Sequence, residues 1–338
     1  MHWRIAADHF GGPGSTWIDD FVPPTAGLTF EKVPPPERGA SWHNQKSART
    51  GAAAWMRHLR HAGQALKGHP GTGLDGLVTV FPQLALTAGA IKRVRRLDLP
   101  LVAWTFNIGT LAPGPRQRLA RFAAPALDRI IVHSPTEIAP YARYFGLPED
   151  RFTFVPLHRP EIDIARAEDT ENPYILAMGT AQRDYPRLIE ALEPHAIRTI
   201  IVAGADLAAS LPTHPWLEVR SGLDRAECWR LLARARLSVT PVSNLRTASG
   251  QVTFVMAMKF GVPVIATRCP GTDGYIEDGR TGILVEPGDT AALRAAIVDL
   301  WDDAPARMRL SQTARAEAEA RFSYTAAGQR MAEELNRV

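Results

Sequence analysis

The sequence predicts an α/β protein built from two doubly wound, Rossmann-like domains. Short apolar runs typical of strands alternate with segments of helical periodicity along the 338 residues. This alternation occurs twice, on either side of the segment LHRPEID at residues 157–163. The length also corresponds to about two domains at roughly 150 residues each.

The first half begins with a strand, a turn and an irregular region. The strand is expected at residues 3–8 and is followed at once by the turn FGGPGS. Residues 15–50 are rich in Pro and Gly and are expected to form long loops with little regular structure. Beyond them, strands are expected at 76–81, 101–106, 129–133 and 152–156, and helices at 50–67, 83–97, 116–127 and 135–145.

The second half repeats the pattern. Strands are expected at 174–178, 199–203, 217–220, 237–241, 264–267 and 282–285, and helices at 184–192, 225–235, 251–260, 290–301 and 305–335, the last with a break near Phe322-Ser323. Such alternation predicts parallel sheets covered by helices on both faces. Ligands bind such sheets at the carboxyl ends of the strands, so we expect the site in a cleft between the two facing domains.

The charge is distributed unevenly. The net charge is +4, but residues 1–160 hold 19 Lys and Arg against 11 Asp and Glu, whereas residues 161–338 hold 20 against 24. The basic residues of the first half form groups on predicted helices, which favours attraction to an anionic surface or acceptor, such as a lipid headgroup or a phosphate. Solvated helix faces are the alternative. Nucleic acid is disfavoured because aromatic residues do not interleave with these groups.

Several classes of protein are excluded by missing motifs. The chain has no G-x-G-x-x-G, P-loop or G-x-S-x-G motif, and its histidines show no metal-ligand spacing, so we expect no metal and no cofactor. Cys228 and Cys269 form no disulfide framework, which favours a reducing compartment. The N-terminus does not read as a signal peptide, and no apolar window is long enough to span a membrane.

A polar, glycine-bearing loop opens the predicted helix at 251–260. The amino end of a helix presents free backbone N–H groups and a partial positive charge, where a diphosphate can bind. Gly250 lets a ligand approach the backbone, and the hydroxyls of Ser249 and Thr253 can donate hydrogen bonds. The alternative is a capped, buried helix with no ligand. The candidate donor-binding residues of this loop are Ser249, Gly250, Gln251, Val252 and Thr253.

Four segments resemble family 4 glycosyltransferases with the GT-B fold. The most specific is GVPVIATRCPGTDGYIEDGRTGILVEPGD at 261–289; the others are the tail from TAALRAAIVDL to RFSY, and residues 127–156 and 172–192. The resemblance implies an N-terminal acceptor-binding domain (1–160), a C-terminal domain that binds a nucleotide-sugar donor (161–320), and a final helix (321–338) that crosses back to the first domain.

The resemblance also assigns candidate residues. Arg183 stands where the family places a basic residue on the donor phosphates, although Asp184-Tyr185 stand near the place of a second one. Asn107 lies near the family's usual His and could hold a sugar hydroxyl or the acceptor, but it cannot act as a base. The further candidates are Gly179, Asp273, Gly274 and Tyr275 for the donor, and Gly12 and Gly14 in the first turn for the acceptor. For Arg183 a surface role, and for the two turns plain turn chemistry, are the alternatives.

One feature departs from the family pattern. The family usually carries two Glu residues that contact the donor, and this chain has Ala248 and Met256 at those positions. Some members carry a G-Q-x-T loop here instead, as this chain does at 250–253.

Taken together, we expect a glycosyltransferase that moves a sugar from a nucleotide-diphosphate donor, UDP-sugar by the family's habit, to a hydroxyl acceptor in glycan or glycolipid biosynthesis. The resemblance implies retention of configuration and no metal. The acceptor is a glycan, a lipid-linked sugar or a small molecule, and the location is cytoplasmic, with peripheral contact at the inner membrane face left open. The alternatives are a non-catalytic nucleotide-sugar-binding or scaffold protein, or an inverting transferase or epimerase on the same fold.

Overall fold

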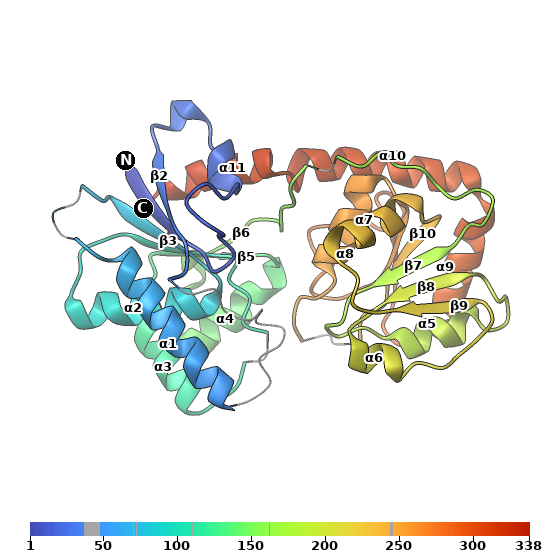
Figure 1. The fold of residues 1–338 in the computed structure, drawn as a ribbon, viewed down its shortest axis with the longest axis horizontal. Coiled ribbons are helices and arrows are strands. Elements are labelled where there is room, and N and C mark those ends of the chain that lie inside the picture. Colours follow the sequence, from blue (N-terminus) through green and yellow to red (C-terminus); the bar gives the residue numbers. More distant parts are fainter. Residues whose placement is uncertain (37–47, 70, 72, 110, 162, 244–245) are drawn as a thin grey trace. The chain divides into compact units, whose positions relative to one another are not determined.

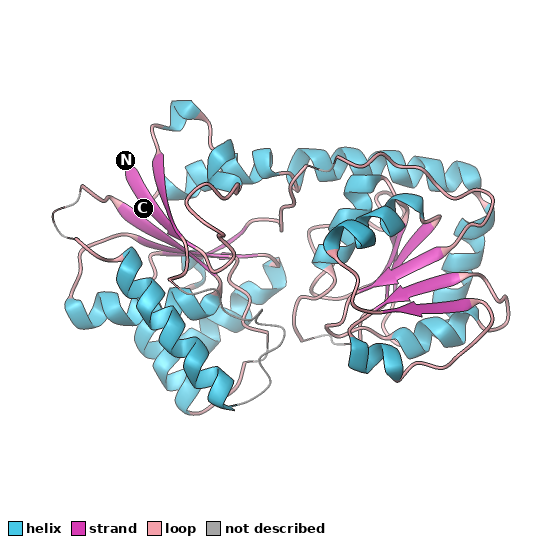
Figure 2. Ribbon diagram, viewed as in Figure 1, coloured by secondary structure: helices cyan, strands magenta, loops and turns pink. Residues whose placement is uncertain are grey.

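The chain folds into two compact units. The computed structural model describes residues 1–338 except 37–47, 70, 72, 110, 162 and 244–245 (Figure 1). One unit consists of residues 1–155 and 327–338, and the other of residues 156–326. Each unit contains a six-stranded sheet with helices packed around it, as Figure 2 shows. The predicted pair of Rossmann-like domains is therefore confirmed.

The sheet of the first unit has the order β2-β1-β3-β4-β5-β6, with all neighbours parallel. Its strands are β1 (His2–Ala6), β2 (Thr29–Val33), β3 (Gly76–Val80), β4 (Leu101–Trp104), β5 (Arg129–Val132) and β6 (Phe152–Phe154). Its helices are α1 (Ala48–Ala65), α2 (Pro82–Arg95), α3 (Pro115–Ala123), α4 (Ile138–Phe145) and most of α11 (Tyr324–Leu335).

The prediction of loops over residues 15–50 is wrong for β2, for two short 3₁₀ helices at Ile18–Phe21 and Pro24–Ala26, and for the start of α1. β2 forms the edge of the sheet, and its charged side chains are paired outside the core. Glu31 accepts a hydrogen bond of 2.7 Å from Arg4 Nε, and the Lys32 ammonium lies 2.7 Å from Asp20. Residues 37–47 of the expected loops lie outside the described part of the chain.

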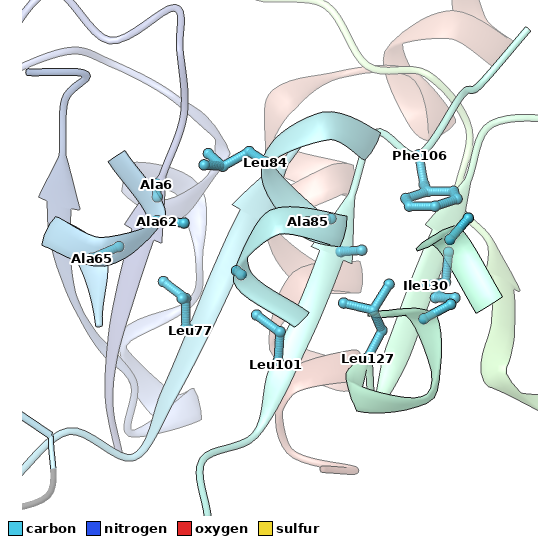
Figure 3. Packing of buried hydrophobic residues seen from close by; sticks show 14 of the residues in the cluster. Ala6, Ala62, Ala65, Leu77, Leu84, Ala85, Leu101, Phe106, Leu127 and Ile130 are labelled. Carbon is cyan, nitrogen blue, oxygen red and sulfur yellow. The ribbon is translucent and has the colours of Figure 1, made fainter. Parts of the chain in front are cut away.

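The core of the first unit lies between its sheet and helices α1 to α4. Every residue of β3 and β4 is buried, as expected for parallel strands covered on both faces. Figure 3 shows Leu77 and Leu101 of these strands facing helices α1 and α2, where Ala62, Ala65 and Leu84 are also buried. The small side chains of α1 allow the helix to approach the sheet closely.

Helix α11 also belongs to the first unit. A Cβ atom on Gly328 would lie 2.4 Å from the carbonyl oxygen of Phe21, so only glycine allows this approach. Glu334 is fully buried, where it accepts a hydrogen bond of 3.1 Å from Thr153 and lies 3.4 Å from Arg129. The predicted break near Phe322-Ser323 is confirmed, because helix α10 (Ala304–Arg321) ends there.

The sheet of the second unit has the order β12-β11-β10-β7-β8-β9, again all parallel. Its strands are β7 (Ile175–Met178), β8 (Thr199–Val202), β9 (Leu217–Arg220), β10 (Leu237–Thr240), β11 (Val264–Thr267) and β12 (Ile283–Val285). Besides α10, its helices are α5 (Tyr185–Leu192), α6 (Ala205–Ala209), α7 (Arg225–Arg234), α8 (Gln251–Phe260) and α9 (Thr290–Asp302). The short helix α6 was not predicted.

Candidate functional site

The sheet of the second unit changes winding direction beside β7. On one side β7 pairs with β8, from which the chain continues to β9, and on the other it pairs with β10, from which the chain continues to β11 and β12. Doubly wound sheets bind ligands outside the carboxyl ends of the strands at such a switch point. Two segments leave the sheet there: residues 179–184 after β7, and residues 241–243 and 246–250 after β10. They define the candidate site.

The two loops are joined by backbone hydrogen bonds. The N–H of Asp184 donates to the carbonyl of Pro241 at 3.2 Å, and the N–H of Ser243 donates to that of Gln182 at 3.0 Å. Gln182 adopts a positive φ of 58° to make this connection. The loops therefore form one backbone framework, which holds the side chain of Arg183 between them.

Four hydrogen bonds hold the guanidinium of Arg183. Its Nε donates to the carbonyl of Met178 at 3.0 Å, and Nη1 donates to that of Ala181 at 2.8 Å. Nη1 and Nη2 also donate to the hydroxyls of Ser249, at 3.3 Å, and Thr253, at 3.0 Å. These bonds fix the orientation of the planar cation.

All four partners of Arg183 are neutral oxygens. Within the described residues, no carboxylate lies at ion-pair distance from the guanidinium. Burial lowers the pKa of Arg183 from its ordinary value, while Tyr185 and Cys269 act in the opposite direction. Arginine nonetheless stays charged in proteins. A partly buried cation with no counter-ion among the described residues is costly, so the site is electrostatically prepared for an anion.

Glycines make room for this arrangement. Gly179 has a φ of 118°, and a Cβ there would lie 2.5 Å from Arg183 Nη2. Gly271, after β11, packs closely on the segment that precedes α8, so that a Cβ would lie 2.0 Å from the carbonyl oxygen of Ser249. Gly179 was predicted as a site residue, whereas Gly271, in the run CPGTDG, was not. Tyr185 was not predicted either, and its hydroxyl donates to the carbonyl of Gly179 at 2.5 Å.

Helix α8 begins directly beside Arg183. Gly250 is its N-cap residue, with a φ of 95°, and supplies no side chain to cap the helix. Its carbonyl accepts from the N–H groups of Thr253, at 2.9 Å, and Phe254, at 3.1 Å. Gln251 is buried, whereas Val252 is half exposed and marks the open side of the helix end. The partial positive charge of this end adds to that of Arg183.

The hydroxyls of Ser249 and Thr253 were expected to donate hydrogen bonds to a ligand, but in the structure they donate to the protein backbone. Each is placed to donate to a backbone carbonyl, Ser249 to Ala181 at 3.2 Å and Thr253 to Met178 at 3.3 Å. Both also accept from Arg183. A hydroxyl has one proton to donate, so these two groups orient the arginine. Four of the five N–H donors of Arg183 are then used within the protein, which leaves one on Nη2 for an anion.

The loop after β11 contributes the remaining candidates of this unit. Asp273 is partly buried, and burial raises the pKa of its carboxyl group. Gly274 is exposed, and its carbonyl accepts from Arg321 at 2.9 Å. The Tyr275 ring is buried against Phe254, and its hydroxyl accepts from the N–H of Leu157 at 2.7 Å. The Tyr275 side chain thus supports the loop from within.

The other candidates lie in the first unit. Asn107 is exposed beyond β4, and its side-chain oxygen accepts from the N–H of Gly109 at 3.0 Å. Gly12 and Gly14 stand in the turn after β1, where a Cβ would meet nothing within 4 Å and neither φ is positive. The protein's own packing therefore does not require glycine at these two positions.

Two features are absent from the described residues. No group of three or more His, Cys, Asp or Glu side chains among them is arranged to hold a metal ion. None of the described helices combines the length and the apolar character needed to cross a bilayer.

Two doubly wound parallel sheets, each in its own unit, define the class of two-domain, Rossmann-like α/β proteins. Residues 172–303 match the family described as Glycosyl transferases group 1. The D-inositol 3-phosphate glycosyltransferase of Corynebacterium diphtheriae is 26% identical over 188 residues, which are 52% of this chain and 42% of that protein. The chain thus spans less than half the length of this relative. The alpha-D-kanosaminyltransferase of Streptomyces kanamyceticus is 37% identical over 70 residues, 21% of this chain and 18% of that one.

Solved structures resemble the whole chain. Sucrose-phosphate synthase from Thermosynechococcus elongatus has a TM-score of 0.72 at 17% identity, covering 99% of this chain and 98% of that one. HepE of Anabaena, in complex with UDP, has a TM-score of 0.67 at 17% identity and full coverage of both chains. The whole chain therefore shares the fold of these structures, the predicted GT-B fold, and residues 172–303 are similar to the Glycosyl transferases group 1 family.

Met256 and Ala248, which stand where the family usually carries two carboxylates, are both buried. Because both side chains are apolar, these positions add no negative charge to the candidate site.

Proposed function

We propose that the chain transfers a sugar from a nucleotide-diphosphate donor, with UDP as the nucleotide, to a hydroxyl acceptor. The observation that carries the proposal is Arg183, a partly buried cation whose four hydrogen-bond partners are all neutral. The diphosphate binds between this guanidinium and the amino end of α8. HepE, a structural neighbour, was solved with UDP and with UDP-glucose, which supports the choice of nucleotide.

The same groups explain how the reaction is accelerated. As the sugar leaves, negative charge develops on the departing diphosphate, and donors that are already oriented stabilise it without reorganising. Gly250 and Gln251 bring backbone amides to the phosphates, and Asp273 and Gly274 meet the sugar. In the first unit, Asn107 and the turn with Gly12 and Gly14 contact the acceptor. The reaction retains the anomeric configuration and needs no metal.

Calorimetric titration with UDP tests the donor site. Arg183→Ala removes charge-assisted hydrogen bonds, so we expect the Kd for UDP to rise by about 10- to 100-fold. The matched control is Arg187→Ala, because Arg187 lies on α5 and its guanidinium bonds to Asp184, Gly288 and Thr290. An unchanged Kd in Arg183→Ala would remove the arginine from the site.

Turnover separates the transferase from a non-catalytic binding protein. With UDP-glucose and other nucleotide sugars, release of UDP in the presence of EDTA supports a metal-independent transferase, and NMR of the product gives its anomeric configuration. Tight binding with neither transfer nor hydrolysis would favour the scaffold alternative. An inverted product would favour an inverting transferase.

We also propose that the first unit contacts an anionic membrane from the cytoplasmic side. Helices α1, α2 and α3, which lie side by side in Figure 1, contain no Asp or Glu. Large apolar side chains are exposed among their basic residues: Trp55, Met56, Leu59, Val94, Leu119 and Phe122. Arg93 stacks over the Phe122 ring at 4.9 Å. Cations interleaved with exposed apolar groups are typical of membrane-surface binding.

Vesicle sedimentation tests this contact. We expect binding to phosphatidylglycerol-containing vesicles but not to pure phosphatidylcholine, weakened by salt and by the double change Leu119→Ser and Phe122→Ser. Met308→Ser is the control, because Met308 is equally apolar and exposed but lies in the other unit. Equal binding to both kinds of vesicle would contradict the proposal.

A further inference from the structure

The first unit has a switch point of its own, between β1 and β3. β1 pairs with β2 on one side and with β3 on the other, and the chain continues from β3 to β4, β5 and β6. By the same rule as in the second unit, a ligand is expected outside the carboxyl ends of β1 and β3. Asp8 lies two residues beyond the end of β1, and Phe81 directly follows β3.

Two histidines of α1 hold the carboxylate of Asp8. His61 Nδ1 lies 3.0 Å from Asp8 Oδ1, and its Nε2 lies 2.8 Å from the carbonyl oxygen of Val33. Both partners are acceptors, so the buried His61 ring is held between the carboxylate and a backbone carbonyl. His58 Nδ1 lies 3.2 Å from Asp8 Oδ2, on the other side of the carboxylate.

This arrangement keeps Asp8 ionised. Burial alone would raise the pKa of Asp8, but the hydrogen bonds and the charges of His58 and His61 outweigh it and hold the pKa well below its usual range. The carboxylate is nonetheless accessible, since 37% of the Asp8 side chain is exposed. A carboxylate offers about four lone-pair sites, and the described hydrogen bond with His61 engages one of them.

The backbone of Phe81, at the end of β3, also suggests that a ligand binds at this edge of the sheet. Phe81 has a φ of 75° and a ψ of 148°, a backbone conformation that is strained for any residue with a side chain. Its ring lies edge-on to that of His9, with centroids 6.2 Å apart. Such strain is commonly found where a fold positions groups for a ligand. The structure thus places a fixed carboxylate next to partly exposed rings at the switch point.

We propose that Asp8 binds adjacent hydroxyl groups of a neutral, polyhydroxylated acceptor, a sugar or a cyclitol, with His58 and His61 as positioning residues. Free lone pairs on an ionised carboxylate accept hydrogen bonds from hydroxyls, whereas a phosphate would be repelled. A cationic ligand is disfavoured because His58 and His61 already offset the charge of Asp8. This inference rests on the proposed function, because it names the group that receives the acceptor of that transfer.

Binding measurements on the full chain test the proposal. Saturation-transfer NMR with glucose and with myo-inositol, in the presence of UDP, reports the acceptor site, and calorimetry with UDP reports the donor site. In Asp8→Asn we expect the polyol that binds the wild type to bind about 10- to 100-fold more weakly, as when charged hydrogen bonds are lost, with the Kd for UDP unchanged. Glu31→Gln is the control, since it removes another carboxylate of this unit, one paired with Arg4 at the sheet edge.

A second variant separates binding from folding. Asp8→Glu keeps a counter-ion for His61 but displaces the carboxylate by one methylene, so we expect a near wild-type unfolding temperature together with weak polyol binding. Wild-type polyol binding in Asp8→Asn or Asp8→Glu, or no binding of either polyol by the wild type, would overturn the proposal. A wild type that binds a polyol but not UDP would contradict the proposed donor site instead.

Discussion

At the scale of single residues, the candidate donor site depends on the exact position of one side chain. Arg183 is held by two carbonyls and two hydroxyls, and glycine on the preceding strand end leaves space for it. Because the arginine has no room to shift, small changes around it should alter binding of the anion without any loss of charge.

Gly179→Ala tests this dependence. The new methyl group would lie 2.5 Å from Arg183 Nη2, and the φ of 118° is strained for alanine. We expect a loss of about 1–3 kcal/mol in the free energy of unfolding and a weaker affinity for UDP. Urea denaturation and calorimetry measure the two effects. Gly14→Ala is the control, because space is open there, and equal effects of the two changes would show that the contact with Arg183 is not what matters.

His133 makes stability depend on pH. It is buried, Nδ1 lies 2.7 Å from the carbonyl oxygen of Val155, and burial lowers the pKa of the ring to about 4. The folded state therefore takes up a proton less readily than the unfolded chain, whose histidine titrates near pH 6.5. The contribution is complete above about pH 6.5 and is lost as pH falls toward 4, with about 2 kcal/mol lost between pH 7 and 5.

His133→Asn should remove this part of the pH dependence, because an amide does not titrate. Urea denaturation at pH 7 and pH 5 measures it, with the exposed His195→Asn as the control. If the difference between the two pH values is the same in His133→Asn as in the wild type, other groups are responsible.

At the scale of elements, the amino end of α8 lies in the candidate site and most of the helix is buried. Nine of its ten residues are buried, including Lys259, whose ammonium lies 3.2 Å from Glu161 Oε1. Glu161 is largely exposed, so it remains solvated if its partner is removed. The amino end of α8 in the candidate site is therefore supported by a packed, buried helix.

Lys259→Met should be tolerated. Methionine fills a similar volume without a desolvated charge, and replacing buried ion pairs by apolar groups is often neutral or stabilising by about 1–4 kcal/mol. Lys259→Ala, which leaves a cavity, should instead destabilise by about 1–3 kcal/mol. Urea denaturation of both variants decides. A severe loss in Lys259→Met would mean that the ammonium itself is needed.

Sequence patterns predicted most elements because buried parallel strands such as β3 and β4 are continuous apolar runs. β2 was missed because Glu31 and Lys32 are neutralised by Arg4 and Asp20, which are distant in sequence. The residues of the candidate donor site were recognisable as strand ends and a helix start. The hydroxyl directions of Ser249 and Thr253, and the contact of Asp8 with α1, depend on tertiary structure that no local pattern contains.

At the scale of the whole molecule, the chain passes between the units twice, after Val155 and after Ala326. The first unit is therefore not a continuous stretch of sequence. Its sheet depends on α11, through the close contact at Gly328 and the buried carboxylate of Glu334.

A fragment of residues 1–155 should consequently be less stable than the same fragment mixed with a peptide of residues 324–338. Without the peptide, Arg129 and Thr153 lose Glu334, and the surface at Phe21 loses its covering helix. We expect the peptide to raise the unfolding temperature, and a peptide with Gly328→Val, which would clash with Phe21, to have no effect. An equally stable fragment with and without the peptide would contradict this account.

The late position of α11 has a consequence for biosynthesis. Domains generally fold as units while the ribosome still extends the chain, starting with the N-terminal one. Here all of residues 156–326 are synthesised before residues 327–338. The second unit therefore has its full sequence while the first unit still lacks most of α11. The order in which the two halves mature is thus expected to be the reverse of the order in which they are translated.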